Sequence, residues 1–397
     1  MKHTKTTAAI LAFGAFAGAA HAQSSVTLYG IVDAGLLVNN NVKGGQEYAL
    51  SQGNSSRFGL KGAEDLGGGL QAIFTLESGF TTATGALGQG GLEFGRKAYV
   101  GLTSPAWGTL TAGRQYSVSN DFTSSFASGA DWAASGLSYG THASDVDNVD
   151  TSNRTQNSIK YESPAFNGLQ FGGLYSLGGQ AGSVTKNEVI DAAVSYSHGP
   201  FRFGAGYMFT KDPYYATYGD QGNSSTSSSG ANDNMNNKIF GGYASAGSQQ
   251  IIVAGGSYAI GAATIGLEYS NTQFQNLGSV SAGGAISAPK YSGGGATFNS
   301  GEINLKYMVT PALLLGGAYI YTRNSGADGY EGAKYNQFNL GAIYSLSKRT
   351  SIYAVGFYEM ASGIDSTGHA AVADLYGSSY SSNNRQLAGI VGITQRF

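Results

Sequence analysis

The sequence lacks cysteine altogether and has only six prolines among its 397 residues. Disulfide bonds and thiolate zinc sites are therefore excluded as sources of stability. Charged residues are also scarce, at 12% of the chain, about half the share found in an ordinary soluble domain. No segment after residue 22 approaches the roughly 18 consecutive apolar residues of a membrane-spanning helix, so helical spans are excluded too.

The first 22 residues have the organisation of a secretory signal peptide. Two lysines precede an apolar run over residues 8–20, and small residues follow in an A-x-A arrangement at residues 20–22. The apolar run is shorter than the ~20 residues that a membrane anchor needs. We therefore expect cleavage after Ala22, which would leave a single mature domain of residues 23–397.

The charge of the mature domain argues against a nucleic-acid partner. The full chain carries 22 Lys and Arg against 24 Asp and Glu, and residues 1–22 contain two lysines and no acidic residue. The mature domain therefore has 20 basic and 24 acidic residues, a net charge near −4. Because nucleic-acid binders present clustered basic residues and this chain has no such cluster, we expect no nucleic-acid binding.

Glycine, with 62 residues, and tyrosine, with 26, are abundant. Apolar and polar side chains alternate along many segments of about ten to twelve residues, and this period of two is typical of β-strands. In residues 301–309, Leu305 and Tyr307 share a face opposite Asn304 and Lys306. The alternation predicts an outward apolar face that carries Leu340, Tyr344, Leu305, Tyr307, Phe203 and Tyr207.

These segments fit a membrane barrel better than a soluble sandwich. A sandwich also alternates, but its strands are usually about 5–6 residues long. Tilted strands of ~9–11 residues cross a bilayer, and tyrosines near strand ends, such as Tyr175 and Tyr269, suit the aromatic girdle at its interfaces. Because a backbone in lipid must satisfy its hydrogen bonds internally, the strands are expected to close into an all-β, antiparallel barrel.

Sixteen strands can be placed along the mature domain, an even number as in bacterial barrels. They span residues 25–37, 47–61, 68–80, 93–104, 108–118, 153–164, 167–178, 186–198, 200–211, 249–260, 262–272, 299–310, 312–323, 334–347, 349–361 and 386–397. Short turns alternate with long loops, as expected for periplasmic turns and external loops. Residues 237–247 could be a further strand, but an even count assigns them to a loop.

Several motifs in this order resemble the general trimeric porins of Gram-negative bacteria, and most of all their beta-proteobacterial branch. They are SVTLYGIVDAGL at 25–36, SRFGLKGAEDLGGGLQAIFTLESGF at 56–80, GRKAYVGL at 95–102, GTLTAGRQY at 108–116 and the terminal Phe397. The resemblance covers essentially the whole mature domain. It implies a homotrimer in the outer membrane, among lipid and lipopolysaccharide, that passes small hydrophilic solutes and ions without a cofactor. It also implies that the barrel-assembly machinery reads Phe397 and that the last strand pairs with the first.

The resemblance further implies where the channel narrows. The family's third loop folds into the barrel, which here corresponds to residues 119–152, opposite arginines on the inner wall. Three positions match those arginines: Arg57, Arg96 and Arg154. Lys61 shares a face with Arg57 by alternation. The family's acidic PEFG motif is absent, and Asp131, Asp145 and Asp147 are our candidates for the acidic partners; the preference for anions or cations stays open.

In this family the first strands form the trimer interface, and Arg114 is a candidate for it. By alternation Arg114 falls on the outward face with Leu110 and Ala112, where a charge is tolerated at a protein interface but is costly in lipid. The alternative is that Arg114 lies at the rim, beyond the hydrocarbon. The orientation of Lys97 raises the same question.

Two other motifs were weighed against the channel. Residues 136–140, GLSYG, match the G-x-S-x-G pattern of hydrolases, but that motif requires a strand before it and a helix after it. Asp145, Asp147 and Asp150 are spaced like the start of a calcium loop, but the Gly and the distal Glu of an EF-hand are missing. We therefore expect no enzyme and no metal site, and the alternative function is a barrel adhesin or a barrel enzyme with activity in its loops.

Overall fold

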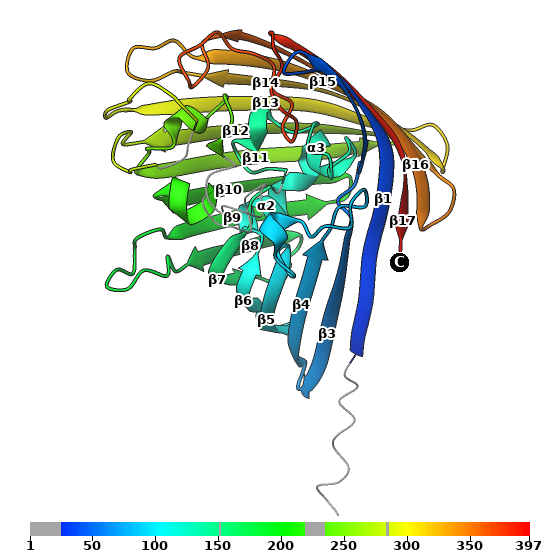
Figure 1. Ribbon diagram of the computed structural model, residues 1–397. Helices are drawn as coiled ribbons and strands as arrows, with labels where there is room; N and C mark the ends of the chain where they lie inside the picture. The colour runs from blue at the N-terminus through cyan, green and yellow to red at the C-terminus, as the bar shows by residue number, and fades with distance from the viewer. Residues whose placement is uncertain (1–24, 151, 219–234, 283–285) are drawn as a thin grey trace, which may run out of the picture.

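The computed structural model describes residues 25–150, 152–218, 235–282 and 286–397, and these residues form one closed β-barrel (Figure 1). The predicted signal peptide lies outside the described residues. The strands are β1 (Ser25–Val42), β2 (Gly45–Ser51), β3 (Arg57–Gly67), β4 (Leu70–Gly79), β5 (Lys97–Ser104), β6 (Gly108–Gln115), β7 (Thr155–Glu162), β8 (Leu169–Ser176), β9 (Val189–His198), β10 (Phe201–Lys211), β11 (Ser248–Ile260), β12 (Ala263–Gln275), β13 (Gly295–Met308), β14 (Leu313–Asn324), β15 (Ala333–Ser345), β16 (Thr350–Gly363) and β17 (Arg385–Arg396). Each strand pairs antiparallel with its neighbours.

The barrel wall has sixteen strand positions, as the sequence predicts, because β2 and β3 share one position. β2 pairs with the second half of β1, from Gly35 to Val42, and β3 pairs with its first half, from Ser25 to Ile31. The prediction of one continuous strand over residues 47–61 was therefore wrong at residues 52–56, where the wall is interrupted.

The interruption in this strand has a local cause in the carboxylate of Asp33. The backbone N–H of Gly53 donates to Asp33 Oδ1 at 2.7 Å, and the side chain of Asn54 donates to Asp33 Oδ2 at 3.1 Å. The hydroxyl of Tyr353 also donates to Asp33 Oδ1, at 2.6 Å. These bonds hold residues 52–56 away from the regular ladder, since a buried carboxylate is stable only when donors surround it.

The first and last strands close the barrel. β1 pairs with β17 from Ile31 opposite Arg396 to Asn39 opposite Ala388. Beyond β17, Phe397 and Gly30 exchange two backbone hydrogen bonds of 3.1 Å. The ring of Phe397 lies over Gly30, where a Cβ atom would come within 2.5 Å of its Cζ atom. The terminal strand predicted from the alternation is thus fully paired and leaves no open edge.

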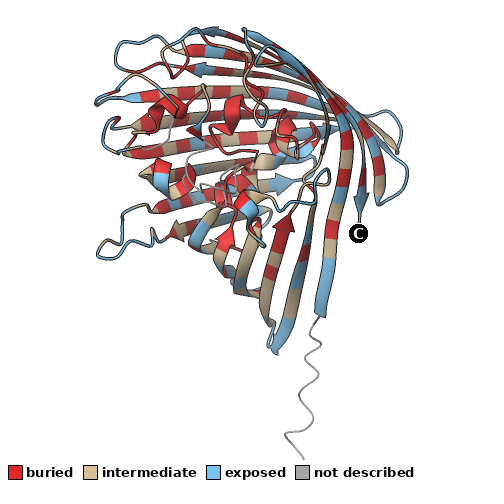
Figure 2. Cartoon of the chain, in the orientation of Figure 1, coloured by how far each residue is buried: buried red, intermediate tan, exposed pale blue. Residues whose placement is uncertain are grey.

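The outward face follows the predicted alternation, which appears in Figure 2 as bands of buried and exposed residues along each strand. The six residues predicted for that face are all exposed: Leu340, Tyr344, Leu305, Tyr307, Phe203 and Tyr207. Their neighbour Asn304 is 5% exposed and points into the barrel. The outer wall is therefore apolar and the inner wall polar, as a barrel surrounded by lipid requires.

Short helices lie in the connections between strands. They are η1 (Gln89–Gly91), α2 (Val118–Thr123), η2 (Ser124–Phe126), α3 (Ser128–Asp131), η3 (Ala143–Asp145), η4 (Tyr214–Tyr218) and η7 (Gly241–Tyr243). In the described part of the chain, no helix has both the length and the hydropathy to cross a membrane. Residues 237–247 contain η7 and no strand, which confirms their assignment to a long loop.

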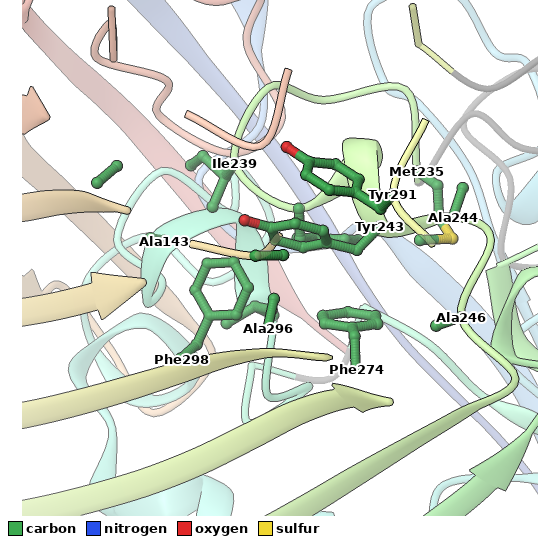
Figure 3. Packing of buried hydrophobic residues seen from close by; sticks show 14 of the residues in the cluster. Ala143, Met235, Ile239, Tyr243, Ala244, Ala246, Phe274, Tyr291, Ala296 and Phe298 are labelled. Atoms are coloured by element: carbon green, nitrogen blue, oxygen red, sulfur yellow. The ribbon is translucent and has the colours of Figure 1, made fainter. Parts of the chain in front are cut away.

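The long loops pack together over part of the barrel mouth, around Tyr243 (Figure 3). The centroid of the Tyr243 ring lies 5.3 Å from that of Tyr291, 6.0 Å from that of Phe274 and 6.1 Å from that of Phe298. Phe274 and Phe298 come from the ends of β12 and β13, so this cluster ties the loops to the wall. Burial of such aromatic side chains contributes about 1.5–3 kcal/mol each and fixes the loops relative to the barrel.

Candidate pore constriction

Residues 117–150, in the loop between β6 and β7, enter the barrel and are called the inward loop below (Figure 1). Its first helix, α2, is capped by Ser117 and lies against β9 and β10. The backbone N–H of Ser119 donates to the carboxylate of Asp191 on β9 at 3.0 Å. At Gly204 on β10, a Cβ atom would lie 2.3 Å from the carbonyl oxygen of Phe122. Glycine at this position therefore allows the helix to contact the wall directly.

The inward loop is bonded to the wall farther around the barrel as well. Two residues of β13, Glu302 and Asn304, bond to the loop. The N–H of Ser128 donates to Glu302 Oε1, and Asn304 Nδ2 donates to the carbonyl of Phe126, both at 2.6 Å. On β15, Gln337 and Asn339 each donate to a loop carbonyl at 2.8 Å. The loop thus crosses the lumen and is held by polar side chains that alternate with the exposed apolar ones.

The opposite side of the lumen carries Arg57, Arg96 and Arg154, the three arginines predicted for the constriction, which we call the arginine wall. Arg96 Nε donates to Glu77 Oε1 at 2.7 Å. Arg57 donates to the carbonyl of Ser55, and Arg154 donates to that of Ser152. Arg96 and Arg154 are both 7% exposed, and their remaining exposed surface lines a cavity of about 690 Å³ in the lumen.

The two arginines that line this cavity converge on one phenol oxygen. The guanidinium groups of Arg96 and Arg154 donate to the hydroxyl of Tyr116 at 3.0 and 2.9 Å. Lys97 belongs to the same group, because it pairs with Glu77 in register and its Nζ lies 5.3 Å from the centroid of the Tyr116 ring. The side chain of Lys97 therefore points into the barrel, which answers the question of its orientation.

The predicted acidic partners lie in three different settings. Asp131 forms an ion pair with Lys306 on β13. Asp145 and Asp147 are buried within the inward loop, where Asp145 accepts backbone N–H bonds from Asp150 and Ser152. Both aspartates thus support the loop's own conformation.

Two carboxylates that were not among the predicted constriction residues, Asp150 and Asp374, line the same cavity as Arg96 and Arg154. Asp150 belongs to the inward loop, and Asp374 belongs to the long loop between β16 and β17. No alternation of apolar and polar residues indicates the position of either side chain, since both lie in irregular segments whose course depends on tertiary contacts.

Buried carboxylates surround His142 where the inward loop meets β12 and β13. His142 Nδ1 lies 2.6 Å from Asp147 Oδ2, and its Nε2 lies 3.4 Å from Glu302 Oε2. Burial would lower the pKa of His142, but Asp147 and Glu302 outweigh it and raise that pKa well above its ordinary value. Burial raises the pKa of Asp145 to about 7 and that of Asp150 well above its ordinary value, and neighbouring carboxylates add to both effects. The loop is therefore held partly by groups that retain protons near neutral pH.

Lys61 and Arg114 lie outside this group. Lys61 is exposed, and its Nζ lies 5.5 Å from the centroid of the Tyr29 ring. Arg114 has the parity of the exposed Leu110, yet it is 8% exposed and its Nε donates to the carbonyl of Gly95 at 2.8 Å. The pairing of β6 with β5 stays in register here, with Arg114 opposite Ala98, so Arg114 keeps its parity and is covered at the strand end by the segment that contains Gly95.

The hydrolase-like motif and the calcium-loop-like motif lack the structural surroundings that their functions require. Residues 136–140 lie in a loop, with turns instead of the strand and helix that a nucleophile elbow needs. Across the described ranges, no group of three His, Cys, Asp or Glu side chains is arranged to hold a metal ion.

A sequence model described as Gram-negative porin matches residues 6–362. The chain is 33% identical over 398 residues to an outer membrane porin protein of Bordetella pertussis, covering 90% of this chain and 94% of that protein. It is 29% identical to outer membrane porin protein 32 of Delftia acidovorans, covering 86% of each.

Solved structures show the same fold. The anion-selective porin from Comamonas acidovorans aligns with a TM-score of 0.66 at 23% identity, covering 94% of this chain and 100% of the other. The trimer form of OmpT from Vibrio cholerae aligns with a TM-score of 0.59 at 16% identity, covering 94% and 99%.

Proposed function

The chain belongs to the family of Gram-negative porins, and on this premise we propose how its inward loop and arginine wall control passage through the channel. The protein is an outer-membrane porin, and its barrel serves the passive diffusion of small hydrophilic solutes. Its relatives are named as porins, and we propose that it has no enzymatic role. The proposed constriction lies between the inward loop, which is bonded to β9, β13 and β15, and the arginine wall.

The observation that carries this proposal is the convergence of Arg96 and Arg154 beside a lumen cavity. Both side chains are held by Tyr116, and both line the cavity together with Asp150 of the inward loop. Fixed charges at a narrow point penalise apolar solutes and set the ion preference of a pore. Solutes that pass the loop must therefore pass within reach of these guanidinium groups.

We further propose a mild preference for anions. Arg57, Arg96, Lys97 and Arg154 face a single carboxylate, Glu77, on their side of the lumen, which is an excess of three positive charges. The acidic groups that line the cavity oppose this excess weakly near neutral pH. Burial raises the pKa of Asp374 to about 7 and raises that of Asp150 well above its ordinary value. A solved porin of the same fold is named anion-selective, in agreement with this direction.

The remaining assignments rest on the family. We propose a homotrimer, with Arg114 as a candidate interface residue, and a signal peptide over residues 1–22. Phe397 is proposed as the residue that the barrel-assembly machinery recognises, because it ends the strand that closes the barrel. The exposed apolar face is proposed to contact outer-membrane lipid, with lipopolysaccharide around the external loops.

Reversal potentials in a planar bilayer test the constriction. Replacing Arg57, Arg96 and Arg154 together by Ser should move the reversal potential in a salt gradient towards cations, because three wall cations are lost. The matched control removes the same charge from Arg202, Arg349 and Arg385, which are exposed near strand ends. The control should keep the wild-type value. Equal reversal potentials in both triple variants would show that the arginine wall does not determine the ion preference, and absence of any current would contradict the channel itself.

A further inference from the structure

Tyr116, one residue beyond β6, stands at the centre of the cationic group. Its hydroxyl oxygen accepts hydrogen bonds from Arg154 at 2.9 Å and from Arg96 at 3.0 Å. Its ring centroid lies 5.0 Å from Arg154 Cζ and 5.3 Å from Lys97 Nζ. The side chain is 7% exposed, so water screens these charges little. Two charged donors at one phenol oxygen favour the phenolate over the phenol.

Charged groups approach Tyr116 from two strands and from two loops. Lys97 comes from β5 and Arg57 from β3, while Arg96 and Arg154 lie in the adjoining loops. The opposing carboxylate is Glu77 of β4, which is shared between Arg96 Nε and the hydroxyl of Tyr29 on β1 at 2.9 Å. Glu77 is thus already engaged with two donors. The phenolic proton of Tyr116 therefore lies in surroundings that are dominated by positive charge.

The acidity of this phenol follows from those surroundings. Burial alone would raise the pKa of Tyr116, but the charges of Arg154 and Arg96 outweigh burial and lower it to about 8. Tyr376 lines the same cavity without a comparable group of cations around it, and burial raises its pKa to about 12. Of Tyr116 and Tyr376, Tyr116 is the one that can lose its proton near physiological pH.

We propose that Tyr116 is a specificity-determining residue of this pore, whose ionisation adjusts how strongly the arginine wall favours anions. The proposal rests on the constriction assigned above and deepens it. With its proton, Tyr116 is neutral and the excess of three positive charges acts on the lumen. Without it, the phenolate forms charge-assisted hydrogen bonds with both arginines and the excess falls to two. The same residues thus give a more anion-selective pore in mildly acidic water and a less selective one in alkaline water.

The test measures the anion-to-cation permeability ratio of the trimer in planar bilayers at about pH 6.5 and about pH 9. We expect the wild-type ratio to fall about two- to fourfold between these values, since one unit charge about 5 Å from a passing ion in the water-filled lumen is worth roughly this factor. In Tyr116→Phe, which keeps the ring but cannot ionise, only the part of the fall that comes from Asp374 should remain, so the ratio should change less with pH than in wild type. Tyr376→Phe is the matched control, and it should retain the wild-type dependence on pH.

A second readout reports the proton itself. The difference in tyrosinate ultraviolet absorbance between wild type and Tyr116→Phe should show one group that titrates with a midpoint near pH 8. A permeability ratio that varies with pH equally in wild type and Tyr116→Phe would overturn the proposal, as would a difference titration without that midpoint. Either result leaves the channel intact, whereas a wild-type protein that carries no current would contradict the constriction on which the proposal rests.

Discussion

The contact between helix α2 and strand β10 can be tested by adding a single methyl group. At Gly204 a Cβ atom would lie 2.3 Å from the carbonyl oxygen of Phe122, whereas ordinary van der Waals contact begins at 3.4 Å. Because β10 is bonded on both sides, in register with β9 and β11, the strand cannot retreat. The helix must therefore move by about 1 Å away from the wall, into the lumen, and overpacking of this kind costs ~1–3 kcal/mol.

We expect Gly204→Ala to lower the single-channel conductance and the thermal unfolding temperature of the detergent-solubilised protein. Gly206→Ala adds a second contact, 2.4 Å from the Cβ atom of Ser119, and the double variant should conduct still less. Gly301→Ala on β13 is the matched control, because no atom lies within 4 Å of its added Cβ. If Gly204→Ala and Gly301→Ala conduct equally well and unfold at the same temperature, the helix does not rest on β10 as described.

Two further predictions concern the wall and the buried carboxylates. Leu305→Arg places a charge on the exposed apolar face and should destabilise the barrel by ~2–4 kcal/mol. The control Lys306→Arg keeps an inward charge beside Asp131 and should assemble normally. Equal folding yields of the two variants in lipid vesicles would refute the assignment of faces. Because the pKa of Asp150 is raised in the folded protein, the folded state holds a proton that the unfolded chain releases, so the contribution of Asp150 to stability is greatest at low pH and falls as pH rises above about 4. In thermal unfolding scans, Asp150→Asn should weaken this fall of stability with rising pH. The control Glu93→Gln, at an exposed loop position, should leave it unchanged. An unchanged pH profile in Asp150→Asn would argue against a protonated Asp150 carboxyl group.

The sequence predicts the barrel well because its information is local. Leu305 and Tyr307 face outward and Asn304 faces inward, since every second residue shares a face and a strand in a barrel has few alternatives. The rule does not predict that Arg114 is only 8% exposed, because the segment that covers it, around Gly95, lies outside its own strand. It also fails at residues 52–56, where a carboxylate distant in sequence draws the backbone out of the ladder.

The candidate site is predicted less completely, because its residues are brought together by the course of loops. The resemblance places Arg57, Arg96 and Arg154 in the wall, and the described geometry groups Arg96 and Arg154 beside the cavity. Tyr116 lies in the quoted GTLTAGRQY motif, but nothing in that motif indicates that two arginines converge on its hydroxyl. Asp374 comes from a loop more than two hundred positions away from these residues in the sequence, and local patterns carry no information about such a contact.

The interrupted strand also makes the closure of the barrel depend on the position of the inward loop. The N–H of Gly136, in that loop, donates to the carbonyl of Gly53 at 2.9 Å, and a Cβ atom at Gly136 would lie 2.0 Å from the nitrogen of Ser55. Residues 52–56 adjoin β1, which is also the strand that completes the cylinder with β17. The loop thus supplies at this gap a hydrogen bond that a neighbouring strand supplies elsewhere. Joining the two ends of the sheet and narrowing the channel are therefore thermodynamically coupled, and the coupling free energy is the same whichever of the two is perturbed.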